Sequence, residues 1–445
     1  MKFVADLHLH SRYSRAVSQA MVLPNMAKWA KLKGINVLAT GDFTHPFWFE
    51  KLKNELEDAG NGLFRLKPEI SNSDRDVQFL LSCEISSIYT QGGKGRRIHN
   101  LFFFPSLASV FEFNKQLVSH GANLRSDGRP IVGLSSRDLV KMALAIDDRA
   151  LIIPAHIWTP WFAVFGSFSG FDSIEECFGD MAKYIYGIET GLSSDPAMNW
   201  KIADLDDRAI LSFSDAHSLE KMGREATVFE AEEISYDSIY NAICKSNKTG
   251  PATPSKISFT IEFYPEEGKY HFTGHRDCNF SQSPEESKKN GDICPVCKRP
   301  LTVGVMHRVQ DLESREIKVK SQVNNGVRWI SGQDTGRPPY VCLVPLGEII
   351  AEALGVGVGS KKVVDQYMAL VQTLGSEFGV LLKSDLLDIA KLAPGKVVQA
   401  IELVRSGNIV VEPGYDGKFG TVKIWKEDEQ IEKSAEGETQ LNLLA

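Results

Sequence analysis

The sequence predicts an α/β protein in three parts: a barrel-like N-terminal domain, a small zinc-ribbon-like module and a helical C-terminal region. Short β-rich runs alternate with helical stretches up to about residue 250, a pattern typical of βα units that close into a sheet or barrel. A cluster of one histidine and three cysteines lies between residues 275 and 297. Helical periodicity returns from residue 346 to about residue 407.

The first domain is expected to span residues 1–250. Helical spacing marks residues 23–33 and 139–145. The expected strands lie at residues 3–10, 37–43, 79–86, 99–104, 151–156, 187–190 and 210–217. After a linker rich in Thr, Pro and Gly, we expect the zinc-binding module at 257–340, the helical region with a small β cap at 345–425, and a disordered polar tail at 426–445.

Composition excludes some classes of protein. The 445 residues are 43% hydrophobic and 24% charged, which predicts a soluble chain with more than one core. There is no secretory signal and no apolar run long enough for a membrane span. Three of the seven cysteines cluster and four are scattered, which favours a reduced, cytoplasmic compartment. The net charge of −7 argues against binding nucleic acid by bulk attraction alone.

Metal-capable side chains stand at or just past the predicted ends of almost every strand. They are His8 and His10, Asp42 with His45, Glu84, His99, His156, and Asp215 with His217. In βα barrels the C-terminal ends of the strands converge, so residues far apart in the chain can meet in one pocket. Two residues that are two positions apart on a strand also share a face, as His8 and His10 would.

A single buried histidine is more often a packed core residue than a ligand. Six of the ten histidines, however, stand at predicted strand ends, which favours a metal centre. Imidazoles mixed with carboxylates suit zinc, manganese, magnesium or iron. Because one ion takes about four ligands, nine candidates predict two or three ions, with Glu84 as a bridge.

In order and spacing these residues resemble the motifs of the polymerase and histidinol phosphatase (PHP) phosphoesterases. The matching motifs are His8-Leu-His10, Thr40-Gly-Asp42, Glu84, His99, His156 and Ser214-Asp-Ala-His217. The resemblance implies a distorted (β/α)7 barrel with a trinuclear centre that hydrolyses phosphoesters with metal-activated water. It implies Asp215, Glu84 and His10 as the catalytic residues.

The resemblance also implies three ligand sets. The first contains His8, His10, Glu84 and Asp215, and the second contains Glu84, His99 and His156. The third joins His217 to a residue of the Asp42 loop. The family has Asp-His after its second strand, whereas Phe43 follows Asp42 here, so either Asp42 or His45 is the expected ligand.

A second metal site is predicted by His275-x-x-Cys278 followed, fifteen residues later, by Cys294-x-x-Cys297. Short turns with paired cysteines are typical of structural zinc. Free cysteine thiols without zinc are the alternative interpretation, and His271 is an alternative to His275. Four protein ligands would close the coordination sphere, so this zinc would stabilise the fold.

The glycine-rich segment 354–362 lies between two helical runs and resembles a helix-hairpin-helix motif. Such a turn exposes backbone N–H groups to a DNA phosphate, with hydrogen bonds and charge added by Ser360, Lys361 and Lys362. Arg12 and Arg97 are further candidates for contact with phosphates. Ordinary packing of a turn, and solvated surface charge, are the alternatives.

The chain ends in an acidic stretch whose last residues resemble the peptide by which bacterial replication proteins dock on the sliding clamp. The candidate contacts are Gln440, Leu441, Leu443 and Leu444. A frayed terminus without a partner is the alternative.

Over nearly its whole length, the order of barrel, zinc module and helical hairpin resembles the endonuclease Q family. The resemblance implies cleavage of damaged DNA on the 5′ side of deoxyuridine, deoxyinosine, deoxyxanthosine and abasic sites. Two alternatives remain: a small-molecule phosphatase of the PHP type, and a non-catalytic module that binds DNA or the clamp. The zinc module and the hairpin have no evident use for a small substrate.

Overall fold

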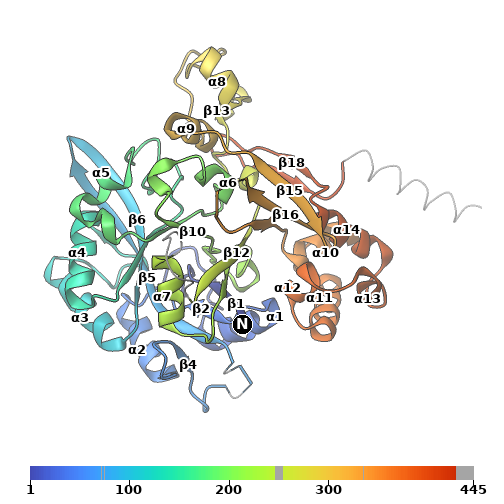
Figure 1. Cartoon of the computed structure of the whole chain (residues 1–445), viewed down its shortest axis with the longest axis horizontal. Coiled ribbons are helices and arrows are strands. Elements are labelled where there is room, and N and C mark those ends of the chain that lie inside the picture. The colour runs from blue at the N-terminus through green and yellow to red at the C-terminus, as the bar shows by residue number, and fades with distance from the viewer. Residues whose placement is uncertain (72, 75, 246–253, 334, 427–445) are drawn as a thin grey trace, which may run out of the picture.

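The computed structural model describes residues 1–71, 73–74, 76–245, 254–333 and 335–426. Figure 1 shows a barrel built from the first half of the chain, with the α8 lobe projecting from it and helices α10–α14 gathered at one side. No helix among the described residues is long and apolar enough to cross a membrane. The predicted clamp peptide, Gln440 to Leu444, lies outside the described residues.

The barrel wall contains both parallel and antiparallel neighbours. Strands β1, β2 and β5 are parallel, β6 runs antiparallel between β5 and β8, and β9 pairs in parallel with β10. A parallel bridge from Leu9 to Ala216 joins the segments that follow β1 and β10. The distorted α/β barrel is therefore confirmed. Its strands are β1 (Lys2–Asp6), β2 (Val37–Ala39), β5 (Gln78–Gln91), β6 (Lys94–Phe104), β8 (Leu151–Pro154), β9 (Gly187–Glu189) and β10 (Ala209–Leu211), with β3 (Leu56–Asp58), β4 (Phe64–Leu66) and β7 (Ile131–Val132) beside β5.

Helices cover the outside of this wall. Helix α1 has the bounds that its periodicity predicts: a proline lies in its first turn, and Gly34 ends it with a φ of 89°. Met26, Ala27 and Ala30 form its buried face. The helices of the barrel are α1 (Leu23–Lys33), α2 (Pro46–Glu55), α3 (Leu107–Ser119), α4 (Ser136–Ile146), α5 (Ile174–Phe178), α6 (Pro196–Asn199) and α7 (Tyr236–Cys244).

Several strand bounds differ from the predicted ones. Strands β1, β2, β8 and β10 all end before the side chains that were expected at their tips. The chain then turns sharply, and Asp42, His156 and Asp215 adopt positive φ values of 52°, 29° and 46°. Residues other than glycine rarely adopt positive φ values. These turns are therefore strained, and they point the three side chains toward the interior of the barrel. The β5–β6 hairpin, in contrast, is longer than predicted.

The barrel sheet continues into the segment predicted as a separate module. Strand β12 pairs with both β11 and β17, and β16 and β15 follow at the edge. Only a small lobe with the zinc-ligand cluster projects from this sheet. The strands are β11 (Ala226–Glu230), β12 (Lys256–Glu262), β15 (Val319–Asn324), β16 (Val327–Gly332) and β17 (Tyr340–Cys342), and the lobe contains β13 (Thr273–His275), β14 (Phe280–Gln282), α8 (Pro284–Asn290) and α9 (Val305–Leu312).

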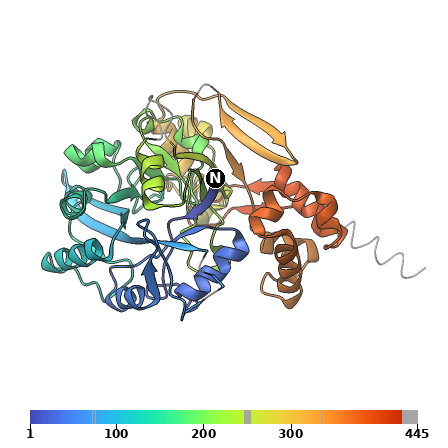
Figure 2. The same ribbon diagram turned by 60° about the horizontal axis from the view of Figure 1, so that its bottom comes forward.

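The predicted helical region is confirmed, and Figure 2 shows it as a cluster beside the barrel. A buried ion pair, 2.8 Å between Lys33 Nζ and Glu377 Oε2, attaches it to α1. Trp29 and Tyr367 pack beside this pair. The elements are α10 (Leu346–Leu354), α11 (Lys361–Leu374), α12 (Glu377–Leu382), α13 (Leu386–Ala390), α14 (Gly395–Ser406), β18 (Val410–Glu412) and β19 (Thr421–Lys423).

Candidate metal centre

Glu84 lies at the middle of the barrel site and divides its oxygens between two groups of imidazoles. Its Oε2 is 3.6 Å from His8 Nε2 and 3.3 Å from His10 Nε2. Its Oε1 is 2.6 Å from His99 Nδ1 and 3.3 Å from His156 Nε2. Both oxygens are buried, so Glu84 has the geometry of a carboxylate that bridges two ions.

Glu84 and His99 were expected at strand ends. In the structure both residues lie within strands, Glu84 in β5 and His99 in β6. Register along the β5–β6 hairpin sets Ser86 opposite His99, and Glu84 shares the face of Ser86 because it is two residues away. A diagonal pair across neighbouring antiparallel strands is close enough for long side chains to meet. The extended hairpin thus brings both candidate ligands to the centre.

Asp215 closes the site from the segment after β10, which pairs with the segment after β1 that carries His8 and His10. Its Oδ1 lies 3.5 Å from His8 Nε2 and 3.2 Å from His10 Nε2. These three buried atoms make no hydrogen bond among the described residues. Buried polar atoms that lack partners are costly, whereas a divalent ion would satisfy all of them at once. The donor set of imidazoles and carboxylates therefore fits such ions.

Two carboxylates hold the histidines from behind. Glu189, the last residue of β9, accepts a hydrogen bond from His8 Nδ1 at 2.9 Å and another from the backbone N–H of His156 at 2.7 Å. Asp42 lies 3.1 Å from His10 Nδ1 and accepts hydrogen bonds from Ser11. A proton held on Nδ1 leaves Nε2 free to bind an ion, as outer carboxylates do in many metal sites.

The resemblance implies that His217 shares an ion with a residue of the Asp42 loop. In the structure His217 instead forms a cluster with His10 and Asp215. The rings of His10 and His217 are 4.8 Å apart, and His217 Nδ1 is 3.7 Å from Asp215 Oδ1. Asp42 already contacts the far side of His10, and His45 stacks on Tyr13 with ring centres 4.5 Å apart. Among the described residues, neither Asp42 nor His45 belongs to a cluster with metal-ligand geometry.

The turn that carries Asp215 is held by a buried acid. Asp6 accepts hydrogen bonds from the backbone N–H and hydroxyl of Ser214, at 3.0 and 2.6 Å, and from the backbone N–H of Gly223 at 2.8 Å. Burial raises the pKa of Asp6 to about 6 in spite of these bonds. This network fixes the strained backbone at Asp215.

Electrostatics in the centre are strongly coupled. Burial by itself would raise the pKa of Glu84, but the charges of His99 and Arg129 hold it well below its usual range. Burial would lower the pKa of His8, but the charges of Glu189 and Asp215 raise it well above its ordinary value. Protons and metal ions therefore compete for the same nitrogens, so ion binding should strengthen as the pH rises.

Two residues at this centre were not predicted. Glu189 is the next-to-last residue of the strand predicted at 187–190, close to the position that identified the other candidates. Arg129 lies in a loop before β7, with Nη1 3.2 Å from Glu84 Oε2. No periodicity marks such a loop, and only the fold brings it to the site.

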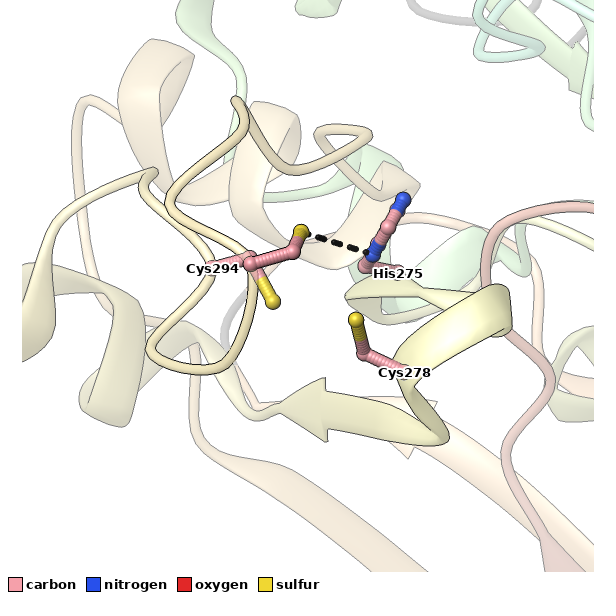
Figure 3. A group of neighbouring side chains, drawn as sticks. His275, Cys278 and Cys294 are labelled. Atoms are coloured by element: carbon pink, nitrogen blue, oxygen red, sulfur yellow. Dashed lines mark hydrogen bonds between the residues drawn. The ribbon is translucent and has the colours of Figure 1, made fainter.

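The second cluster lies in the lobe and consists of His275, Cys278, Cys294 and Cys297, whose ligand atoms are within 4.8 Å of one another. Figure 3 shows His275, Cys278 and Cys294 pointing toward a common centre. Burial would raise the pKa of Cys294, but hydrogen bonds from the backbone of Cys297 and Val296 lower it to about 7 and favour the thiolate. His271, the alternative ligand, lies outside this cluster.

A cavity of about 340 Å³ opens beside the barrel centre. His99, His156 and Asp215 form its metal-facing wall. The remaining lining includes Trp161, Phe162, Ser193, Lys269, Tyr270 and His271. Trp161 stacks on Phe168 at 4.6 Å and meets Tyr270 edge-on at 5.5 Å, so both the barrel and the neighbouring 265–271 segment build this cavity.

The candidate DNA contacts lie on exposed surfaces. Ser360 caps α11 by accepting a hydrogen bond from Val363 N–H, and Lys361 and Lys362 are exposed at the same helix start. Arg12 and Arg97 are exposed as well, with the Arg97 guanidinium 5.7 Å from the centre of the Phe162 ring.

Comparison with known proteins gives two family matches: the PHP-associated family over residues 201–247, and the MJ0043 C-terminal domain over 345–408. MJ0043 of Methanocaldococcus jannaschii is 32% identical over 268 residues, which cover 60% of this chain but only 31% of that protein. YqxK of Bacillus subtilis is 28% identical over 434 residues, covering 95% of this chain and 99% of YqxK.

Two solved structures match almost the whole chain. The lesion-specific endonuclease PfuEndoQ from Pyrococcus furiosus has a TM-score of 0.79 and 32% identity, with 96% of each chain covered. Endonuclease Q in complex with a 27-mer duplex that carries an abasic lesion has a TM-score of 0.78 and 33% identity, over 96% of this chain and 98% of that one.

The barrel and its cluster of imidazoles and carboxylates define the class as a metal-dependent phosphoesterase with a PHP fold. Identity above 30% over nearly the full length of both solved structures narrows the class further. The chain belongs to the endonuclease Q family.

Proposed function

We propose that this protein is a DNA-repair endonuclease that hydrolyses the phosphodiester on the 5′ side of deaminated bases and abasic sites. Its substrates would contain deoxyuridine, deoxyinosine, deoxyxanthosine or an abasic residue. A family member has been solved with an abasic duplex at its active site, which supports damaged DNA as the ligand class. The observation that carries the proposal is the cavity that opens directly onto His99, His156 and Asp215.

The cavity suits one unstacked base. Enzymes that read a damaged base in a duplex rotate it out of the helix and hold it by stacking and by hydrogen bonds to its edge. Trp161, Phe162 and Tyr270 offer aromatic faces, and Ser193 and Lys269 offer polar groups. A base seated there would leave its flanking phosphate near the metal centre.

Divalent ions in the barrel would lower the pKa of a bound water and neutralise charge on the phosphate. The surrounding residues set the geometry for this chemistry. Glu84 lies between the two groups of imidazoles, while His10 and Asp215 present unpartnered atoms from neighbouring segments. Zinc, manganese, magnesium and iron all remain candidates, in two or three positions.

The DNA backbone is proposed to lie along the helical hairpin and the rim of the barrel. Ser360, Lys361 and Lys362 would bind one phosphate at the start of α11, and Arg12 and Arg97 would bind others. Structural zinc in the lobe would keep the 265–271 wall of the cavity in place. Contact with a sliding clamp through the chain terminus is a separate proposal, which deletion of residues 438–445 tests by loss of clamp binding.

The test uses labelled duplexes that carry one uracil, one hypoxanthine, one abasic site or no lesion. We expect a nick confined to the lesion strand, and none in the undamaged duplex. Asp215→Asn should abolish the nick while the affinity for lesion DNA stays within about threefold. Equal cutting of undamaged DNA would contradict lesion specificity. Hydrolysis of a small phosphomonoester without any nick would show that the protein is a phosphatase.

A further inference from the structure

Arg129 is a cation that reaches the metal centre without belonging to the ligand set. Its Nη1 lies 3.2 Å from Glu84 Oε2, the oxygen that faces His8 and His10. The Arg129 side chain is 28% exposed, whereas that of Glu84 is fully buried. The guanidinium therefore lies at the boundary between the buried carboxylate and the solvent from which a substrate must arrive.

The loop that carries Arg129 is fixed in place from several sides. Pro130 accepts a hydrogen bond from the backbone of Ser86 on β5, and Gly128 donates one to the backbone carbonyl of Tyr13. Thr44 donates its hydroxyl to the carbonyl of Gly128 at 3.0 Å. A Cβ at Gly128 would lie 2.4 Å from Asp42 Oδ2, so the loop packs without spare room against the support of His10. The Arg129 side chain is thus held ready before any ligand binds.

Charge balance indicates what Arg129 is for. The Arg129 guanidinium lies 3.2 Å from Glu84, so it would also lie near any divalent ion that Glu84 coordinates. Charges interact strongly where water is scarce, so the ion and the guanidinium would repel each other unless an anion lay between them. The two carboxylates of the candidate ligand sets, Glu84 and Asp215, carry less negative charge than two divalent ions and the arginine carry positive charge. A phosphodiester supplies the missing negative charge, and two of its oxygens match the fork of N–H groups on a guanidinium.

We propose that Arg129 is a catalytic residue that binds the non-bridging oxygens of the scissile phosphate and stabilises the negative charge that grows on them. This inference rests on the proposed function. As the attacking water oxygen bonds to phosphorus, the bond to the leaving oxygen breaks. The water loses one proton and the leaving oxygen gains one, so the number of protons does not change overall. Arg129 keeps its proton throughout and contributes only hydrogen bonds and charge.

The first test compares Arg129→Ala and Arg129→Lys with the wild-type protein on an abasic duplex. Removal of one fixed donor to a transition-state oxygen typically costs about 100-fold in kcat, so we expect that loss in the alanine variant and a smaller one in the lysine variant. Arg65→Ala is the matched control, because Arg65 is a half-exposed arginine on β4 whose partner is Glu57. Bound metal per chain should be unchanged in all of these variants.

The second test measures binding without cleavage. In the Asp215→Asn background, Arg129→Ala should weaken binding of a duplex with a normal phosphodiester at the cleavage position by about tenfold. The same duplex with a neutral methylphosphonate at that one linkage should bind equally well with or without Arg129. This difference isolates the contact between the guanidinium and the phosphate charge.

Three results would overturn the proposal: cleavage by Arg129→Ala within about threefold of wild type, loss of bound metal in that variant, or an equal affinity loss with both linkages. The last two would mean that Arg129 acts only through Glu84. If the wild-type protein itself fails to nick lesion DNA, it is the proposed function that fails, which separates the two hypotheses.

Discussion

The two candidate metal sites of this protein are built in opposite ways. The lobe site takes all four candidate ligands from residues 275–297 and needs only local chain geometry. The barrel site gathers buried ligands from His8 to His217 and depends on carboxylates behind them. A local site with a closed set of four ligands stabilises structure, whereas a dispersed site with unpartnered atoms is suited to chemistry.

The largest expected effect is at the bridge of the barrel site. Glu84→Gln removes the charge that both groups of imidazoles share, so we expect cleavage to fall by at least about 1,000-fold. Metal analysis should show fewer ions per chain, with the lobe zinc retained. Glu112→Gln, an exposed change on α3, is the control. Full metal content in Glu84→Gln would contradict the bridging geometry.

Glu189→Gln separates support from ligation. The amide cannot hold the proton on His8 Nδ1 as a carboxylate does, so cleavage and metal affinity should fall by about 10- to 100-fold. The measurement is kcat over a titration of the metal ion, in which excess metal should restore part of the activity. An effect as severe as that of Glu84→Gln would mean that Glu189 is itself a ligand.

Cys294→Ser tests whether the lobe site is independent of the barrel. We expect loss of one zinc per chain and proteolytic cutting within residues 273–302, while the barrel keeps its ions. Because the 265–271 wall of the cavity adjoins the lobe, KM for lesion DNA should rise by about tenfold with a smaller change in kcat. Loss of the barrel ions in this variant would show that the two sites are coupled.

The last expected effect is on stability and not on cleavage, and it concerns a buried acid of the barrel outside the ligand sets. Glu262 accepts hydrogen bonds from Thr190, Ser212 and Thr260, and burial raises its pKa to about 8. A raised acid pKa stabilises the fold below the unfolded value near 4.5, and this stability is lost as the pH rises toward 8.

Denaturant unfolding of the wild-type protein should therefore lose roughly 3 kcal/mol between pH 5 and pH 8 through this group. Glu262→Gln stays neutral at both values, so its unfolding free energy should decline less over the same range. An equal decline in both proteins would mean that Glu262 is ionised throughout.

Local patterns in the sequence predicted several elements well. Helix α1 has its predicted bounds because capping and periodicity are properties of the segment itself. The tips of β1, β2, β8 and β10 were placed too far along the chain, since a ligand-bearing turn and a strand share the same alternation of residues. The β5–β6 hairpin extends to Gln91 and Lys94, beyond its predicted strands. Its tip is polar and lacks the hydrophobic residues that mark a strand in the sequence.

The sequence alone determined the class of fold, the spacing of the lobe cysteines and the residues able to bind metal, because these depend on composition and on short-range order. Only the tertiary structure decided that Asp42 supports His10 and that Glu189 and Arg129 reach the centre. The reason is physical: which atoms of distant loops meet depends on how strands pack and where the backbone bends, and no pattern along the chain encodes those distances directly.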